Sequence, residues 1–185
     1  MLKSRSNRYG SVAVSLHWLS AIAILALLAT GFRAAGAVDP AVEAELLRLH
    51  VPLGLTVLLL TLARLGWWLF VDRKPAPITG TPPWQDRLAR TIHVAFYVIL
   101  FGMVGSGIAL TALSGAGAVL FSGSGTLPDF PDFAPFAVHG IGAMSLIALL
   151  VLHTGAALYH QFIRRDGILR RMWYRRGDTA ASIED

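Results

Sequence analysis

Three histidines, His139, His153 and His160, lie in the mostly apolar stretch from Phe133 to Arg164. An apolar run of this length predicts a membrane-spanning helix, in which an ionisable side chain is usually functional. His139 and His153 are fourteen residues apart, which places them within about 40° on one helix face and roughly 21 Å apart along its axis. Each ring then lies near one side of a hydrocarbon layer about 30 Å thick. Two imidazoles at two depths suggest two cofactors. The alternative is two buried rings that hydrogen-bond to neighbouring helices.

The composition places the chain in the membrane class. Its 185 residues are 55% hydrophobic and 15% charged, and the mean hydropathy is +0.58. Cysteine is absent, which excludes disulfides, thiolate metal sites, c-type haem attachment and cysteine catalysis. The net charge is +5, but the basic residues cluster beside the apolar runs, so the pattern favours membrane topology and no nucleic acid as partner.

Four apolar segments predict four spans, at about 11–32, 46–71, 88–113 and 133–164. The first lacks a small-residue cleavage site and is interpreted as a span rather than a cleavable signal. The connections are expected at 33–45, whose Asp39-Pro40 indicates the start of the next helix, at the proline-rich 72–87, and at 114–131. The last of these could accept a docking partner or cover a site on its own side of the membrane. Because no repeat and no second domain are evident, the prediction is one all-α domain, a four-helix membrane bundle over residues 1–185.

Lysine and arginine are distributed unequally between the two sides of this predicted bundle. The amino terminus, the middle connection with its flanks, and the tail 164–176 carry 3 + 5 + 6 = 14 of them, whereas the other side has only Arg33 and Arg48. Cytoplasmic loops are enriched in these residues, so both termini are expected in the cytoplasm.

This topology gives each histidine a depth. His17 and His153 fall near the cytoplasmic face, whereas His50 and His139 fall near the outer face. A porphyrin held by two imidazoles needs one ligand from each side at equal height, so the pairs predict two haems within the bundle. Small residues that could admit the macrocycle are expected beside the ligands, at Gly54, Gly140, Gly142 and Gly155. A zinc or copper site would need three or four donors at short spacing, and a proton relay would need carboxylates inside the spans. Neither pattern is present.

The chain resembles the bacterial cytochrome b561 family of dihaem membrane cytochromes. The resemblance runs from Arg8-Tyr9 through Leu16-His17-Trp18-Leu19, His50-Val51 with Arg64 and His93 to His139 and the segment 152–160. It implies ligation of two haem b groups by His17, His50, His139 and His153, and a ubiquinone site that uses His93 and His160. A member of this family that is similar to the chain is a superoxide oxidase. The resemblance therefore also implies a place in the inner membrane of a bacterial cell and this activity, in which superoxide is oxidised at the periplasmic side and ubiquinone is reduced.

The residues bear on the quinone site in their own right. His160 lies seven positions beyond His153, about 10 Å closer to the cytoplasm, and His93 is expected at a similar depth. Two imidazoles at the edge of a haem could hydrogen-bond quinone carbonyls and supply protons, and the alternative is two interfacial histidines near lipid headgroups. Arg64, at the depth of the inner haem, could pair with a propionate or extend to the surface.

The charge of the outer loops argues against superoxide as the electron donor. The outer loops hold two arginines against five carboxylates, a formal 2 − 5 = −3, which steers an anion poorly. A competing function is an electron-transfer subunit that docks a periplasmic dehydrogenase, reductase or c-type cytochrome. A scaffold without a cofactor fits the apolar spans but not the paired depths.

Overall fold

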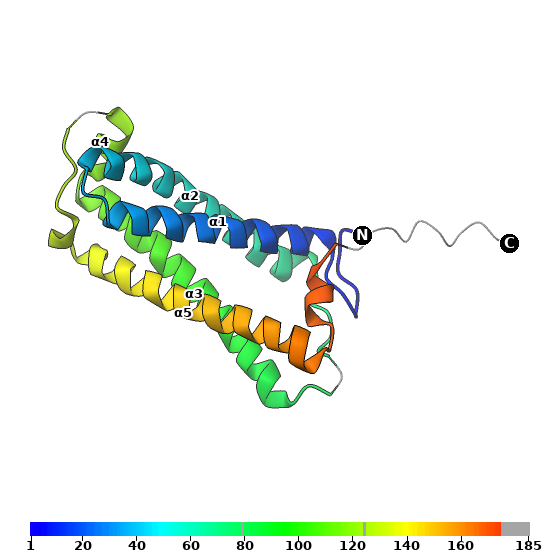
Figure 1. Cartoon of the computed structure of the whole chain (residues 1–185). Coiled ribbons are helices and arrows are strands. Elements are labelled where there is room, and N and C mark those ends of the chain that lie inside the picture. The colour runs from blue at the N-terminus through cyan, green and yellow to red at the C-terminus, as the bar shows by residue number, and fades with distance from the viewer. Residues whose placement is uncertain (79, 124, 175–185) are drawn as a thin grey trace.

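The structure of the protein is a computed structural model, which describes residues 1–78, 80–123 and 125–174 (Figure 1). Its four long helices are each long and apolar enough to cross a membrane, which confirms the all-α bundle. They are α1 (Ser11–Ala35), α2 (Pro40–Gly66, continued by the π-helical turn Trp67–Val71), α3 (Pro83–Leu113) and α5 (Ala134–Tyr159, continued by the π-helical turn His160–Arg164). The short elements are α4 (Ala116–Ser122) and the 3-10 turns Phe130–Asp132 and Ile168–Met172. Arg175 and Arg176 of the basic tail lie outside the described residues.

The elements differ from the expected spans in three places. α2 begins at Pro40, the start that Asp39-Pro40 indicates, so it is longer than the span expected from about residue 46; the Asp39 side chain accepts the Ala41 N–H at 2.9 Å and proline suits the first helical position. α3 begins at Pro83 rather than at residue 88, because proline again suits the first helical position. The segment 114–131, expected as a loop, contains α4 between two left-handed glycines, Gly115 and Gly123.

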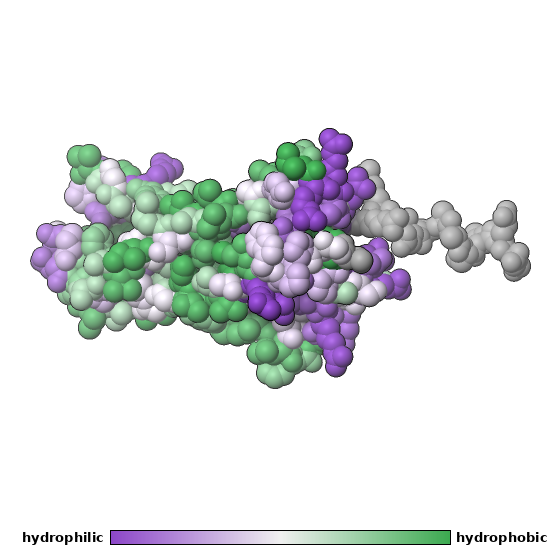
Figure 2. All heavy atoms as spheres, turned by 90° about the horizontal axis from the view of Figure 1, so that it is seen from below, coloured by the Kyte–Doolittle hydropathy of each residue, from purple (hydrophilic) through white to green (hydrophobic). Residues whose placement is uncertain are grey.

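The four long helices form two pairs, which are followed by colour in Figure 1. α1 (blue) packs along α2 (cyan), α3 (green) packs along α5 (yellow to orange), and contacts between the pairs are made mainly by α2 and α3. The amino terminus and the end of α5 lie at one end of the bundle, and α4 lies at the other. The space-filling view shows a broad apolar band between two polar ends, as expected of a surface that faces lipid (Figure 2).

The buried centre of the bundle is one apolar layer with a single residue from each long helix. Ile24, Val57, Leu100 and Leu146 form this cluster. Leu146 is seven residues from both His139 and His153, and Val57 is seven beyond His50. Seven residues are close to two helical turns, so the histidine levels lie about 10 Å on either side of this layer. The central layer therefore separates two polar levels.

The basic end is where the amino terminus, the connection after α2 and the segment 164–174 meet. Asp72 accepts hydrogen bonds from the Ser4 N–H and hydroxyl and from Trp67 Nε1, and Arg171 donates to the carbonyl oxygens of Ser6, Asn7 and Ala76. Burial alone would raise the pKa of Asp72, but these donors together hold it below its ordinary value. The carboxylate is thus charged at neutral pH and joins the amino terminus to the end of α2, whereas Arg171 joins the segment 164–174 to the other two segments.

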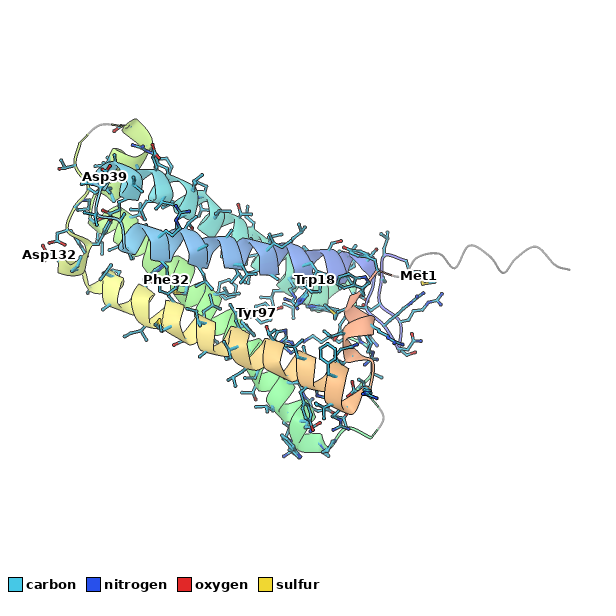
Figure 3. All side chains as sticks on the ribbon, viewed as in Figure 1. Met1, Trp18, Phe32, Asp39, Tyr97 and Asp132 are labelled. Atoms are coloured by element: carbon cyan, nitrogen blue, oxygen red, sulfur yellow. The ribbon has the colours of Figure 1, made fainter. Side chains whose placement is uncertain are left out.

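The acidic end is the opposite one, with α4, Asp39 and Asp132; Figure 3 shows these two carboxylates there, and Met1 and Trp18 at the basic end. Arg48 donates from Nε to the carbonyl oxygen of Leu120 at 2.9 Å. This bond fastens α4 to α2. Arg48 therefore has a structural role, in addition to any effect of its charge on an electron donor.

Candidate functional site

The level nearer the acidic end contains His50 of α2 and His139 of α5. Their ring centroids are 6.1 Å apart and the rings are nearly perpendicular, at 70°. Glycines of the other two helices face them. A Cβ on Gly31 would lie 2.9 Å from His50 Cε1, and one on Gly107 would lie 3.3 Å from His139 Cε1. Any larger residue at Gly31 would have to displace the imidazole, so these glycines make room for the two rings.

A hydroxyl orients each of these rings. Thr30 Oγ1 lies 3.1 Å from His50 Nδ1, and Ser106 Oγ lies 3.0 Å from His139 Nδ1. Both hydroxyls donate their own proton to a carbonyl oxygen within their helix, Ala26 or Leu27 for Thr30 and Met103 for Ser106. Each hydroxyl must then accept from the ring, which assigns the proton to Nδ1 and leaves the Nε2 lone pair available to a metal.

The level nearer the basic end contains three histidines from three helices. The His17 and His153 ring centroids are 6.2 Å apart. His93 of α3 also lies against His153, with centroids 5.7 Å apart, and Phe96 packs edge-on against the same ring at 5.5 Å. His93 is therefore at the level of the inner pair rather than beyond it, which corrects the depth expected from the sequence.

The two pairs fit haem iron by their spacing and by what they leave unpaired. Two metal–nitrogen bonds of about 2 Å, with the ring centres set about 1 Å further back on each side, place two imidazole centroids roughly 6 Å apart. Both pairs have this spacing. The His17 Nδ1 is buried without a hydrogen-bond partner among the described residues, so the protein leaves a polar atom unsatisfied at this level. Among the described residues no group of three or more His, Cys, Asp or Glu could hold a bare metal ion.

Arg64 places a positive charge at the inner level. Its Nε is buried without a hydrogen-bond partner among the described residues, and its charge acts on both His17 and His153. Lys74, outside the spans, has its pKa lowered by burial and then by repulsion from Arg64. Two cations held near each other favour an anionic group between them, and a haem propionate has the required charge.

His160 has different neighbours from His93. Its Nδ1 lies 2.5 Å from Asp166 Oδ2, and its ring packs edge-on against Tyr159. The ring contact found for His93 is instead with His153. The structure therefore brings together His50 with His139, and His17 with His153, His93 and Arg64, whereas His160 pairs with a carboxylate that the sequence did not suggest.

The sequence analysis missed the groups that support the outer pair. Thr30-Gly31 and Ser106-Gly107 are each a hydroxyl residue followed by glycine, and each glycine is fourteen residues after a histidine, His17 or His93. This shared spacing is the signal that could have identified them. The glycines expected to admit the macrocycle differ among themselves. A Cβ on Gly54, Gly140 or Gly155 would meet open space, whereas one on Gly142 would contact the Met103 side chain.

Comparison with known proteins assigns the family. Residues 8–175 match the family described as prokaryotic cytochrome b561. The chain is 31% identical over 181 residues to cytochrome b561 homolog 2 of Escherichia coli K12, covering 90% of this chain and 91% of the relative, and 29% identical to homolog 1, covering 92% and 99%. It is 30% identical over 171 residues to cytochrome b562 of Cereibacter sphaeroides, covering 89% and 94%. The chain therefore belongs to the prokaryotic cytochrome b561 family of membrane b-type cytochromes that transfer electrons.

Proposed function

We propose that the protein holds two haem b groups, one between His50 and His139 and one between His17 and His153, and carries electrons across the bacterial inner membrane. The observation that carries this proposal is the pair of imidazole spacings, 6.1 and 6.2 Å, at two levels on either side of the central apolar layer. Each haem supplies reversible one-electron chemistry at its iron. The protein supplies the ligands, their orientation and a dry surrounding.

The supporting side chains have separate roles in this proposal. Thr30 and Ser106 hold the outer imidazoles with Nε2 free, since both hydroxyls accept from Nδ1. Arg64 compensates the charge of an inner propionate. Ile24, Val57, Leu100 and Leu146 exclude water between the two levels.

Ubiquinone is proposed as the electron acceptor at the basic end, which the excess of lysine and arginine assigns to the cytoplasm. His160 and His93 are its proposed contacts. His160 lies beyond the inner pair towards this end, and His93 flanks His153. With superoxide as donor, two superoxide anions lose one electron each to give two O₂, and one ubiquinone gains two electrons and two protons to give ubiquinol.

A cationic electron-transfer protein is a second candidate donor, and the charge of the acidic end favours it. Arg33 and Arg48 face five carboxylates there, Asp39, Glu43, Glu45, Asp129 and Asp132. Arg48 is also engaged with the Leu120 carbonyl. A negative surface attracts a positively charged partner and repels superoxide.

Ionic strength distinguishes the two donors. If superoxide is the donor, reduction of the haems stays constant or accelerates as salt is raised from about 0.01 to 0.15 M, because screening weakens the repulsion. Reduction by a cationic c-type cytochrome should instead slow about tenfold or more over the same range. The measurement is stopped-flow absorbance of the reconstituted protein with each donor. If superoxide failed to reduce the haems at every salt concentration, superoxide would be rejected as the donor.

Replacing His160 with Ala tests the quinone site. We expect both haem spectra and fast reduction by a chemical donor to be preserved, and reoxidation by a soluble ubiquinone analogue to slow by about 10- to 100-fold, because one hydrogen bond or proton donor is lost. His93→Ala should also slow reoxidation, but with a change in the inner-haem spectrum because His93 contacts His153. Arg33→Ala at the opposite end is the matched control and should leave reoxidation unchanged. Wild-type reoxidation in His160→Ala would place the quinone elsewhere.

A further inference from the structure

Asp166 reaches His160 because the chain reverses directly after α5. The helix widens into the π-helical turn His160–Arg164, and Arg165 then adopts a left-handed conformation with φ of 54°. A residue with a Cβ rarely adopts this conformation, and Gly167 follows with φ of 76°. These two residues return the chain towards α5, so that Asp166 lies beside the first residue of the π-helical turn. Such turns are frequent at functional sites.

Both oxygens of Asp166 are engaged. Oδ2 lies 2.5 Å from His160 Nδ1 and 3.7 Å from Arg164 Nε, and Oδ1 accepts the Ile168 N–H at 3.2 Å. The side chains of His160 and Asp166 are only 16% and 12% exposed. Burial alone would raise the pKa of Asp166, but the hydrogen bonds from His160 and Ile168, with the charge of Arg164, hold it below its ordinary value. The carboxylate is therefore charged at neutral pH and can only accept.

This contact determines which nitrogen of His160 is available. Because Asp166 is an acceptor, His160 Nδ1 must carry a proton and donate it, which leaves Nε2 as the atom that can exchange a proton with a ligand. A histidine whose Nδ1–H is held by a carboxylate is fixed in orientation.

We propose that Asp166 is a positioning residue for proton delivery to the quinone, an inference that rests on the proposed role of His160. The protonated His160 breaks its Nε2–H bond, and that proton forms an O–H bond on the quinone oxygen as the quinone accepts electrons. The ring is left neutral with Nδ1 still bonded to Asp166, and it takes the next proton from water at the basic end. Each ubiquinone takes two protons, so the cycle runs twice for each ubiquinol formed.

The other groups around the pair do not replace the carboxylate. Arg164 shares Oδ2, but its Nη1 also donates to Gln85 Oε1 of α3 at 3.2 Å. Tyr159 of α5 presents its ring edge-on to His160, at 5.8 Å between centroids, and the turn at Ile168 contributes only its backbone N–H. Asp166 is therefore the negative charge that the structure places against His160.

The test compares Asp166→Asn with Asp166→Glu in the haem-loaded protein in lipid vesicles. Asn retains an oxygen acceptor but removes the charge, whereas Glu retains the charge. We expect Asp166→Asn to lower kcat for reduction of a soluble ubiquinone analogue roughly tenfold with KM within about twofold, and its rate to fall at a lower pH than the wild-type rate. Glu should restore most of kcat. Asp86→Asn, an acidic residue in the first turn of α3, is the matched control and should behave as wild type.

A second readout needs neither haem turnover nor quinone. Diethylpyrocarbonate modifies the unprotonated imidazole, so peptide mass spectrometry can follow the modification of His160 against pH. In Asp166→Asn the modification should persist to lower pH than in the wild type, since the protonated ring has lost its counter-charge. Unchanged profiles for both kcat and modification in Asp166→Asn would overturn the inference, as would equal losses in Asn and Glu. If His160→Ala itself reduced quinone at the wild-type rate, the proposed quinone role would fail instead.

Discussion

His139→Ala should lose one haem and keep the other. His139 and His50 are the two rings of the outer pair, and the central layer separates them from the inner histidines, so the inner site should assemble without them. The haem content should fall from two to about one per chain in His139→Ala, and likewise in His50→Ala. Pyridine-haemochrome analysis and redox-difference spectra measure this loss. Ser106→Ala, which removes only the partner of His139 Nδ1, should weaken haem retention by about 10- to 100-fold without abolishing it.

A rescue separates lost ligation from lost fold. His139→Gly leaves a space for free imidazole, and added imidazole should restore the outer-haem spectrum if only the ligand is missing. The same spectrum should be unaffected by imidazole in the wild type. Equal bleaching of both haems in a folded His139→Ala protein, or no loss at all, would show that the pairing by level is wrong.

His153→Ala should interrupt electron transfer between the two ends. His153 is the residue that the other inner groups surround, since His17, His93 and Phe96 all contact its ring. Without it the inner haem is lost, and electrons that enter at the acidic end have no redox centre next to the basic end. We expect the outer haem still to be reduced by the donor, while ubiquinone reduction falls to background.

The measurement is made in vesicles with the donor on one side, and the haem redox state and quinone consumption are followed together. Leu146→Val, in the central layer of the same helix, is a suitable control, because it should keep both haems and most of the rate. Quinone reduction by His153→Ala at more than about a tenth of the wild-type rate would mean that electrons reach the quinone without the inner pair.

The levels of the site were predictable from the sequence because helix geometry converts residue spacing into depth. The fourteen-residue spacing of His139 and His153 together with the alternating direction of the spans predicted the pairs that the structure brings to 6.1 and 6.2 Å. The spacing of histidines within one helix says little about which residues of a neighbouring helix face those histidines. This is why Gly31 and Gly107 were missed and the depth of His93 was misjudged.

Asp166 was beyond the reach of the sequence argument for a different reason. The tail after residue 164 is basic and polar, and its composition predicts only an exposed end. Its place depends on a left-handed residue, Arg165, that carries a Cβ, and composition does not signal such a turn. The start of α2 was predictable, since Asp39-Pro40 is a recognisable cap followed by good helix formers.

The haem-to-polypeptide ratio of the purified wild-type protein tests the central claim most directly. Both groups should be released by acidified acetone, because the chain has no cysteine to bond them covalently. Two imidazole pairs predict two b-type haems per chain, each with the low-spin spectrum of an iron between two histidines. A ratio of one, or a high-spin spectrum for either haem, would contradict the assignment of one haem to each level.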